Sequence, residues 1–99
     1  MTAYLALTQN VADLEKYVDE YVPPVLQLFE KYGIEILAAQ FGASAIEGNA
    51  NCVVVLRAES EDVFRNLYND PDYEAPKALR HSITSNPNLL VAPEFAPRR

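Results

Sequence analysis

Four polar side chains in the last third of the 99-residue chain could contact a small polar ligand. The phenols of Tyr68 and Tyr73 can donate hydrogen bonds, and the guanidinium of Arg80 can hold a carboxylate. The imidazole of His81 titrates near neutral pH, so it could act as a general acid or base. A DPDY turn at residues 70–73 can bring the two phenols near the helix that carries Arg80, and we expect these side chains to line the edge of a pocket between helix and sheet.

Each of these residues also has a structural interpretation. Tyrosine rings are commonly buried in amphipathic packing while their hydroxyls remain hydrated. Arg80 and His81 are adjacent, and adjacent residues on a helix diverge by about 100°. The sequence therefore predicts that the two do not face one pocket easily, and that His81 is a surface residue at the end of its helix. No catalytic residue can be assigned from the sequence.

Metal and nucleotide sites find no support in the sequence. His81 is the only histidine and Cys52 the only cysteine, which leaves no multi-histidine metal site and no paired cysteine motif. The glycine-rich motifs that cradle phosphates do not occur. We expect neither a metal nor a cofactor. Cys52 lies among apolar residues, where the pKa of a thiol is raised and the thiol is inert, whereas Glu47 and Arg57 could form an exposed ion pair across a rim or a dimer interface.

The net charge argues against one class of partner. Fourteen acidic residues outnumber eight basic ones, giving a formal net charge of −6 at pH 7. Such a surface repels nucleic acids and anionic lipids. No apolar run approaches the roughly 20 residues of a membrane-spanning helix. We therefore expect no nucleic-acid partner, no membrane partner and a cytoplasmic location, and a single cysteine gives no sign of an oxidising compartment.

The apolar pattern predicts four strands and two helical regions. Short apolar runs that end at turn residues predict strands at residues 2–8, 34–41, 51–58 and 89–92. Apolar residues spaced three and four apart predict a helix over 11–32, a second over 59–69, and a weaker continuation over 73–83. Residues 1–95 are then a single domain, and residues 96–99 a frayed C-terminal tail.

Local signals refine the first helix. Asn10 is a suitable N-cap, and Gly33 a suitable stop. Pro23 and Pro24 lack the backbone N–H that continues a helix, so the sequence predicts a kink or a restart near Val22.

This order of elements predicts an α+β fold: a ferredoxin-like β-α-β-β-α-β sandwich whose antiparallel sheet carries its helices on one face. The second and third strands are apolar on both sides, but two helices can cover only one side. A second copy of the chain is the economical cover, so we expect a homodimer formed through the sheet face. The alternative is that residues 42–51 or the C-terminal tail cover it.

Several segments together resemble a known family. They are AYLALT, YVPPVLQLFEKYG, ILAAQFGASAIEG, VVVLRAES and YNDPDYEAPKALR, and they resemble the small bacterial family called domain of unknown function 1330 over nearly the whole chain. The resemblance implies the dimeric α/β-barrel superfamily, in which two ferredoxin-like domains join their sheets and which includes small monooxygenases and lactone isomerases. It therefore implies a homodimer, and the family name carries no established activity.

Two classes of function follow as hypotheses. The first is an uncharacterised homodimer that binds a small organic molecule. In its catalytic version this protein is a metal-free enzyme that acts on a small organic or aromatic compound, in a monooxygenase-like or isomerase-like reaction. The alternative is a non-catalytic module that binds a metabolite or a partner protein. The absence of a recognisable acid–base pair favours the alternative mildly.

Overall fold

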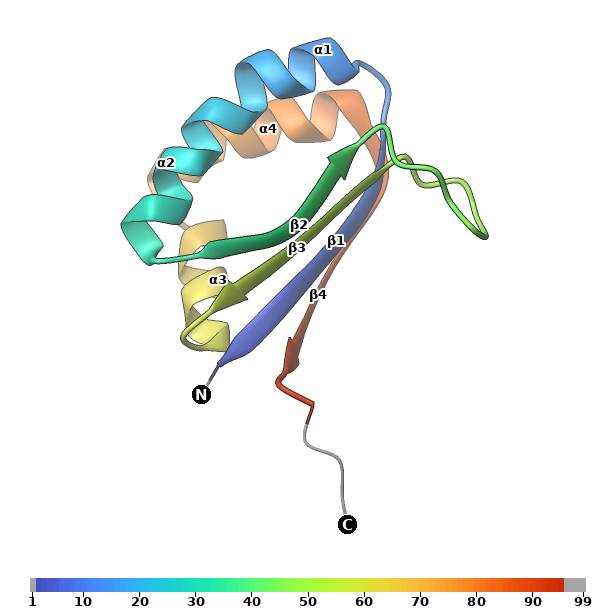
Figure 1. Cartoon of the computed structure of the whole chain (residues 1–99). Coiled ribbons are helices and arrows are strands. Elements are labelled where there is room, and N and C mark those ends of the chain that lie inside the picture. The colour runs from blue at the N-terminus through green and yellow to red at the C-terminus, as the bar shows by residue number, and fades with distance from the viewer. Residues whose placement is uncertain (1, 96–99) are drawn as a thin grey trace.

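In the computed structural model, which describes residues 2–95, four strands and a set of helical segments alternate along the chain (Figure 1). The strands are β1 (Ala3–Val11), β2 (Glu35–Phe41), β3 (Cys52–Ala58) and β4 (Thr84–Pro93). The helical segments are α1 (Leu14–Lys16), η1 (Tyr17–Tyr21), α2 (Val22–Tyr32), α3 (Glu61–Tyr68), η2 (Pro71–Tyr73) and α4 (Glu74–Ile83). The expected tail at residues 96–99 lies outside the described residues. No helix within residues 2–95 is long and apolar enough to cross a membrane.

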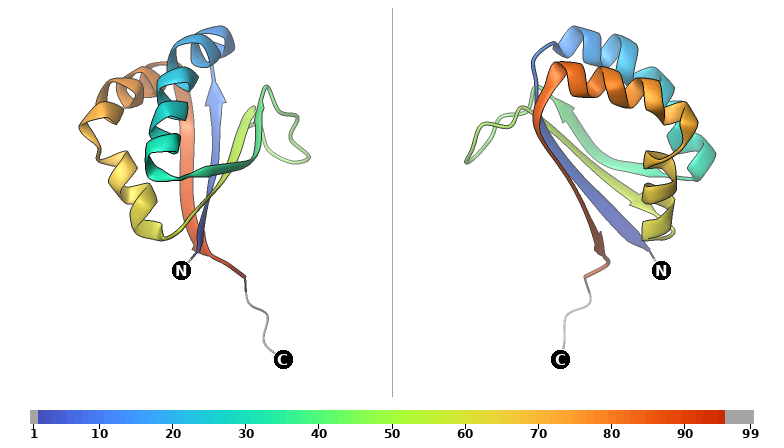
Figure 2. Two further views of the ribbon diagram at one scale, coloured as in Figure 1. Left: turned by 60° about the vertical axis from the view of Figure 1, so that its left-hand side comes forward. Right: turned by 180° about the vertical axis from the view of Figure 1, so that it is seen from behind.

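The sheet has the strand order β2-β3-β1-β4, and each neighbouring pair runs antiparallel. The helices lie together on one face of this sheet, and the other face carries none of them (Figure 2). This arrangement is the ferredoxin-like α+β fold, which confirms the fold that the sequence predicts. The core lies between the helices and the sheet, where alternate residues of β1 and β3 are buried.

The first helical region changes its hydrogen-bonding pattern just before its two prolines. Its middle segment η1 is a π-helix, in which the backbone N–H of Val22 donates to the carbonyl of Tyr17. Pro23 and Pro24 have no N–H to bond the carbonyls four residues earlier, and α2 begins at Val22 with the prolines in its first turn. The predicted restart near Val22 is confirmed.

The sequence predicts the C-terminal end of this helical region correctly but not its N-terminal end. Gly33 follows α2 in the left-handed conformation with φ 66°, as expected of a glycine that ends a helix. Asn10, however, is not the N-cap, because β1 continues to Val11 and Asn10 pairs with Ser85 of β4. The cap is Asp13, whose carboxylate accepts a hydrogen bond from the backbone N–H of Lys16 at 3.0 Å.

The last strand is longer than the sequence predicts. It begins at Thr84, directly after α4, rather than at residue 89. Proline is a poor strand residue, but Pro87 is tolerated here because β4 is an edge strand and its register against β1 shifts between Thr8 and Asn10. Asn86 lies at this irregularity with a φ of 52°.

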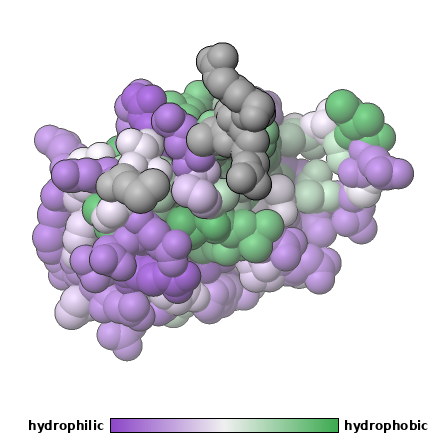
Figure 3. Space-filling model, turned by 90° about the horizontal axis from the view of Figure 1, so that it is seen from below, coloured by the Kyte–Doolittle hydropathy of each residue, from purple (hydrophilic) through white to green (hydrophobic). Residues whose placement is uncertain are grey.

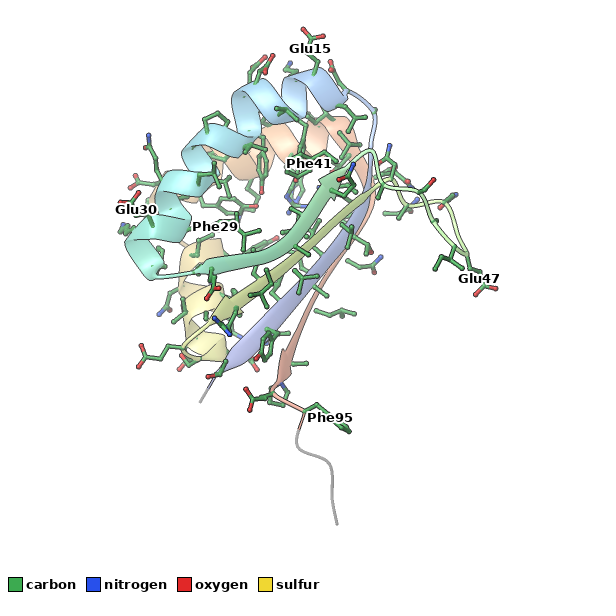
Figure 4. The ribbon with its side chains drawn as sticks, viewed as in Figure 1. Glu15, Phe29, Glu30, Phe41, Glu47 and Phe95 are labelled. Atoms are coloured by element: carbon green, nitrogen blue, oxygen red, sulfur yellow. The ribbon has the colours of Figure 1, made fainter. Side chains whose placement is uncertain are left out.

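The strand β2 departs from simple alternation. Its register against β3 shifts between Ile36 and Ala38, so a bulge lies at Leu37. Beyond the bulge, Phe41 lies opposite Cys52 on the helix-facing side, and Figure 4 shows Phe29 and Phe41 directed into the space between helices and sheet, whereas Glu15 and Glu30 point outward. A strict period of two would place Ile36 and Ala38 on one face of the strand, but the bulge between them breaks this alternation.

The face without helices carries an apolar row across all four strands. The strand register places Ala38, Val55, Ala6 and Leu90 side by side, and we call these four residues the central row. Leu90 is 68% exposed. The loop at residues 42–51 therefore does not cover this row. Seen from below, hydrophobic side chains gather in the middle of the surface with hydrophilic ones around them (Figure 3).

A buried carboxylate ties the α3–α4 connection to the end of α2. The Asp70 side chain accepts hydrogen bonds from the Tyr32 hydroxyl at 2.5 Å and from Lys31 Nζ at 2.9 Å. It also accepts one from the backbone N–H of Asp72 at 2.8 Å, which caps η2. These contacts fix the turn that positions Tyr73 and α4.

Candidate functional site

A cleft of about 380 Å³ opens between the α3–α4 side of the helical layer and the β1–β4 side of the sheet. Its apolar lining comes from both layers, whereas its polar and charged lining comes from α3, α4 and the residue that follows α3. Its lining residues are Leu5, Phe64, Arg65, Tyr68, Asn69, Arg80, His81, Pro87, Leu89 and Val91.

The Arg80 side chain forms the polar floor of this cleft. It is only 1% exposed, although it lines the cleft. Its Nε donates to the Tyr73 hydroxyl at 3.3 Å, and its Nη1 donates to Gln9 Oε1 at 3.3 Å. Its Nη2 lies 3.2 Å from Nε2 of His81. The guanidinium is therefore held in place by three uncharged groups from β1, η2 and α4.

No carboxylate within residues 2–95 lies within 4.0 Å of Arg80, since the ion pairs of that part of the chain involve other basic residues. A buried charge is normally paired, because removing an ion from water is costly. The cation in the floor of the cleft is thus solvated by neutral dipoles alone.

A chain of hydrogen bonds continues from Arg80 into the core. The hydroxyls of Tyr73 and Tyr21 lie 2.7 Å apart. On the other side, Gln9 Nε2 donates to the Tyr17 hydroxyl at 3.0 Å and lies 3.8 Å from the Cys52 sulfur. The π-helix η1 supplies both Tyr17 and Tyr21, whose rings stack with centroids 4.8 Å apart. A π-helical turn at such a position is frequent at functional sites.

The groups of this network hold fixed protonation states. Burial raises the pKa of the phenols of Tyr17 and Tyr21, so both stay neutral. Burial opposes the charged form of Arg80, but the phenol oxygens of Tyr73 and Tyr21 outweigh it and raise its pKa. Burial also raises the pKa of the Cys52 thiol, as the sequence predicts. Arg80 is therefore the one charged member of this network.

His81 lies at the solvent side of Arg80. Arginine can only donate, so Nε2 of His81 accepts this hydrogen bond and the proton of the neutral ring resides on Nδ1. Partial burial and the positive charges of Arg80 and Lys77 lower the pKa of His81. The sequence predicted that Arg80 and His81 do not easily face one pocket. That expectation is wrong, because both residues line the cleft. The arginine side chain is long enough for its Nη2 to reach the ring of the adjacent His81.

A small inner chamber of about 60 Å³ adjoins the cleft within the core. The two spaces share Leu5, Phe64, Tyr68 and Leu89 as lining residues. Apart from the tyrosines, the walls of the chamber are aliphatic or phenylalanine side chains. The cleft therefore has an apolar recess beside its charged floor.

The structure brings the four predicted site residues together in two adjoining spaces. Tyr68, Arg80 and His81 line the cleft, and Tyr73 lines the inner chamber and bonds Arg80. Tyr73 is buried, as the structural interpretation expects of its ring, and its hydroxyl bonds Tyr21 and Arg80. Whether these side chains bind a ligand stays a prediction.

One polar member of the site, Gln9, is not predicted by the sequence pattern. It is fully buried and occupies an inward position of β1, where Ala3, Leu5, Leu7 and Val11 are its buried companions. A polar residue in an apolar strand register is a signal that could have identified it. Glu47 and Arg57 do not pair within the chain, because Glu47 lies in the loop before β3 (Figure 4) while Arg57, near the far end of β3, pairs with Glu35. A contact between them across a dimer interface stays a prediction.

Within residues 2–95, no three His, Cys, Asp or Glu side chains gather as a metal ion would require.

The fold is similar to several solved structures of low sequence identity. A protein of unknown function from Rhodopseudomonas palustris superposes with a TM-score of 0.80 at 13% identity, covering 97% of this chain and 84% of that one. A dimeric ferredoxin-like protein of unknown function from Thermobifida fusca YX gives a TM-score of 0.56 at 20% identity, with coverages of 93% and 90%. An ethyl tert-butyl ether D (EthD) family protein from Bacillus halodurans C-125 gives 0.56 at 13%, with 96% and 99%.

Sequence comparison gives a family without an activity. No curated protein matches the chain. The family model that matches is described as a domain of unknown function, DUF1330, and it matches residues 2–94.

Proposed function

The chain belongs to the DUF1330 family, and from the cleft beside Arg80 we propose that it is a homodimeric protein that binds a small organic molecule. One observation carries the proposal: the cleft combines an apolar wall with convergent polar groups. Small-molecule sites have this composition, since apolar walls supply most of the contact area and a few polar groups set the orientation. The volume of about 380 Å³ suits a ligand of modest size.

The homodimer rests on the central row. An exposed apolar row in the middle of a sheet face is the feature that an isologous contact between two copies would bury. The neighbouring rows on each side are more polar: Gln40, Val53, Thr8 and Asn88 form one of them, and Glu35, Arg57, Tyr4 and Ala92 form the other. An apolar centre with a polar rim is typical of interfaces. The protein from Thermobifida fusca with a similar fold is described as dimeric.

Binding without turnover is the function that the geometry supports best. A catalytic version of the cleft would need a proton acceptor that is free to reach the ligand. The lone pair of His81 Nε2 is engaged by Arg80, and burial raises the pKa of the Tyr21 phenol and keeps it neutral. The monooxygenase-like and isomerase-like versions therefore rank below a binding protein.

A thermal-shift screen of small organic compounds, followed by NMR titration, tests the proposal. A compound present at about 100 times its Kd should stabilise the fold by about 2.7 kcal/mol. We expect the amide shifts of Leu5, Leu89 and Val91 at the cleft to move, while that of Val53 on the other face stays constant. A screen without hits, or hits that map away from the cleft, would contradict the proposal. A hit that the protein consumes would restore the catalytic version.

A further inference from the structure

The floor of the cleft presents a positive charge whose counter-charge the described part of the chain does not supply. The chain has a net charge of −6, yet the cleft lining contains no aspartate or glutamate. It contains Arg80, Arg65 and His81 instead. Arg65 is exposed and already pairs with Glu61 on α3 at 2.6 Å. Arg80 is thus the buried cation of the cleft, and its contacts within residues 2–95 are to neutral groups.

The hydrogen bonds of Arg80 leave part of its donor capacity unused. A guanidinium has five N–H donors, and three contacts to Tyr73, Gln9 and His81 occupy one donor on each nitrogen. These contacts measure 3.2–3.3 Å, longer than the roughly 2.7–2.9 Å of a charge-assisted pair. Within residues 2–95, Nη1 and Nη2 each retain one N–H, and two such donors match the two oxygens of a carboxylate.

The surroundings of Arg80 specify the rest of the ligand. Leu5, Leu89 and Val91 of the sheet line the same cleft with apolar side chains, and we call these three its apolar wall. The inner chamber, reached past Phe64 and Tyr68, adds a recess of about 60 Å³ for an apolar group. A free inorganic anion would leave this wall in contact with water, whereas an organic acid would cover it.

We infer that the ligand of the cleft is a small organic carboxylate, with its carboxylate on the guanidinium of Arg80 and its aromatic or branched aliphatic body against Leu5, Leu89 and Val91. The inference rests on the proposed function of the same cleft and names the class of compound that it takes. The neutral partners of Arg80 then act as a cradle: Gln9 and Tyr73 fix the plane of the guanidinium, and the ligand supplies the missing negative charge.

Matched pairs of probes test the charge separately from the shape. Benzoate and benzamide have nearly the same size and differ in charge, as do phenylacetate and phenylacetamide. Each is titrated into the protein at constant ionic strength, with NMR detection at Leu5, Leu89 and Val91. We expect each carboxylate to bind at least about tenfold more tightly than its amide, the lower end of what a hydrogen bond to a charged group contributes. Inorganic phosphate should bind more weakly than benzoate.

The outcomes separate the two levels of the proposal. Equal affinity for acid and amide, or a preference for the amide, would overturn the carboxylate assignment while leaving small-molecule binding intact. Phosphate binding as tightly as benzoate would assign the cleft to simple anions and overturn the organic acid. If none of the probes moves the cleft resonances while other compounds from the screen do, the carboxylate assignment fails and the binding function stands. If no compound of any kind does, both fail.

Three arginine substitutions locate the charge. Arg80→Gln should weaken benzoate binding at least about tenfold, whereas Arg65→Gln removes the same charge at the exposed rim and should change it less than about threefold. Arg80→Lys keeps the charge of the floor without the planar fork. If the Gln variant does not fold, the Lys variant should still prefer benzoate to benzamide but bind it more weakly than the wild type. Affinity unchanged in Arg80→Lys would contradict a bidentate contact.

Discussion

The hydroxyl oxygens of Tyr21 and Tyr73 lie 2.7 Å apart, although 52 positions separate the two residues in the chain. This contact joins the π-helix η1 to the short helix η2 beneath the cleft. The Tyr73 hydroxyl also accepts from Arg80 Nε, so it has two partners, whereas the Tyr21 hydroxyl has Tyr73 as its one partner within residues 2–95.

This asymmetry predicts unequal costs for removing the two hydroxyls. Tyr21→Phe deletes one hydrogen bond and leaves Tyr73 with Arg80, so we expect a loss of about 1 kcal/mol in the free energy of unfolding. Tyr73→Phe deprives both Tyr21 and Arg80 of a buried partner, and the expected loss is about 2–3 kcal/mol. Urea denaturation of the two variants measures the difference. Equal losses, or a larger one for Tyr21→Phe, would show that Tyr73 does not connect the network.

Asp70 predicts a dependence of stability on acid. The Tyr32 hydroxyl, the Asp72 backbone N–H and Lys31 lower the pKa of Asp70 from 3.8 to about 2 in the folded protein. Because the folded value lies below the unfolded one, the stabilisation is fully present above about pH 4 and disappears as the pH falls towards 2. The Asp70→Asn variant should be less stable than the wild type at pH 6 and nearly equal to it at pH 2.

Asp72→Asn is the matched control for this experiment. Asp72 is exposed and lies 4.0 Å from Lys31, so its loss should leave the acid dependence of the wild type unchanged. Thermal melts at a series of pH values provide the measurement. A constant difference between Asp70→Asn and the wild type from pH 6 to pH 2 would rule out Asp70 as the titrating group.

The fold could be predicted because its signals are local and repetitive. Alternation of apolar residues such as Val54 and Leu56 indicates the strand β3. The glycine after α2 indicates the end of that helix. The errors fall where pairing with a distant strand overrides local preference. Asn10 is a good helix cap in isolation but pairs with Ser85 instead, and the bulge at Leu37 exists only against β3.

The candidate site was predicted less completely than the fold. Residue type and the DPDY turn identify Tyr73 and Arg80, but burial and charge balance are properties of the whole fold. That no carboxylate of residues 2–95 lies near Arg80, and that Gln9 bonds it from 71 positions away, depends on which strands and helices meet. Such relationships require the tertiary structure.

Cys52 should be protected from thiol reagents in the folded protein. It is buried between the sheet and the helices, and its raised pKa keeps it in the unreactive thiol form. We expect its reaction with an aromatic disulfide reagent to be slow in buffer and to accelerate in urea along the unfolding curve. Fast labelling in buffer without loss of structure would show that the core opens locally at β3.

The central row makes the homodimer testable with one residue. Leu90 is 68% exposed in the single chain, so Leu90→Asp should not disturb the fold of the protomer. In a face-to-face dimer that buries the central row it would place two unpaired carboxylates in the interface, which we expect to weaken association by at least about 100-fold. Sedimentation at micromolar concentration should therefore give a dimer for the wild type and a monomer for Leu90→Asp.

Leu26→Asp separates the sheet face from a general effect of added charge. Leu26 is 45% exposed on α2, on the helical side of the molecule, and its substitution adds the same charge away from the central row. It should sediment as the wild type does. If the wild type is a monomer at micromolar concentration, the dimer is wrong. If Leu26→Asp dissociates and Leu90→Asp does not, the copies meet through their helices, because an unpaired charge weakens association only where the interface buries it.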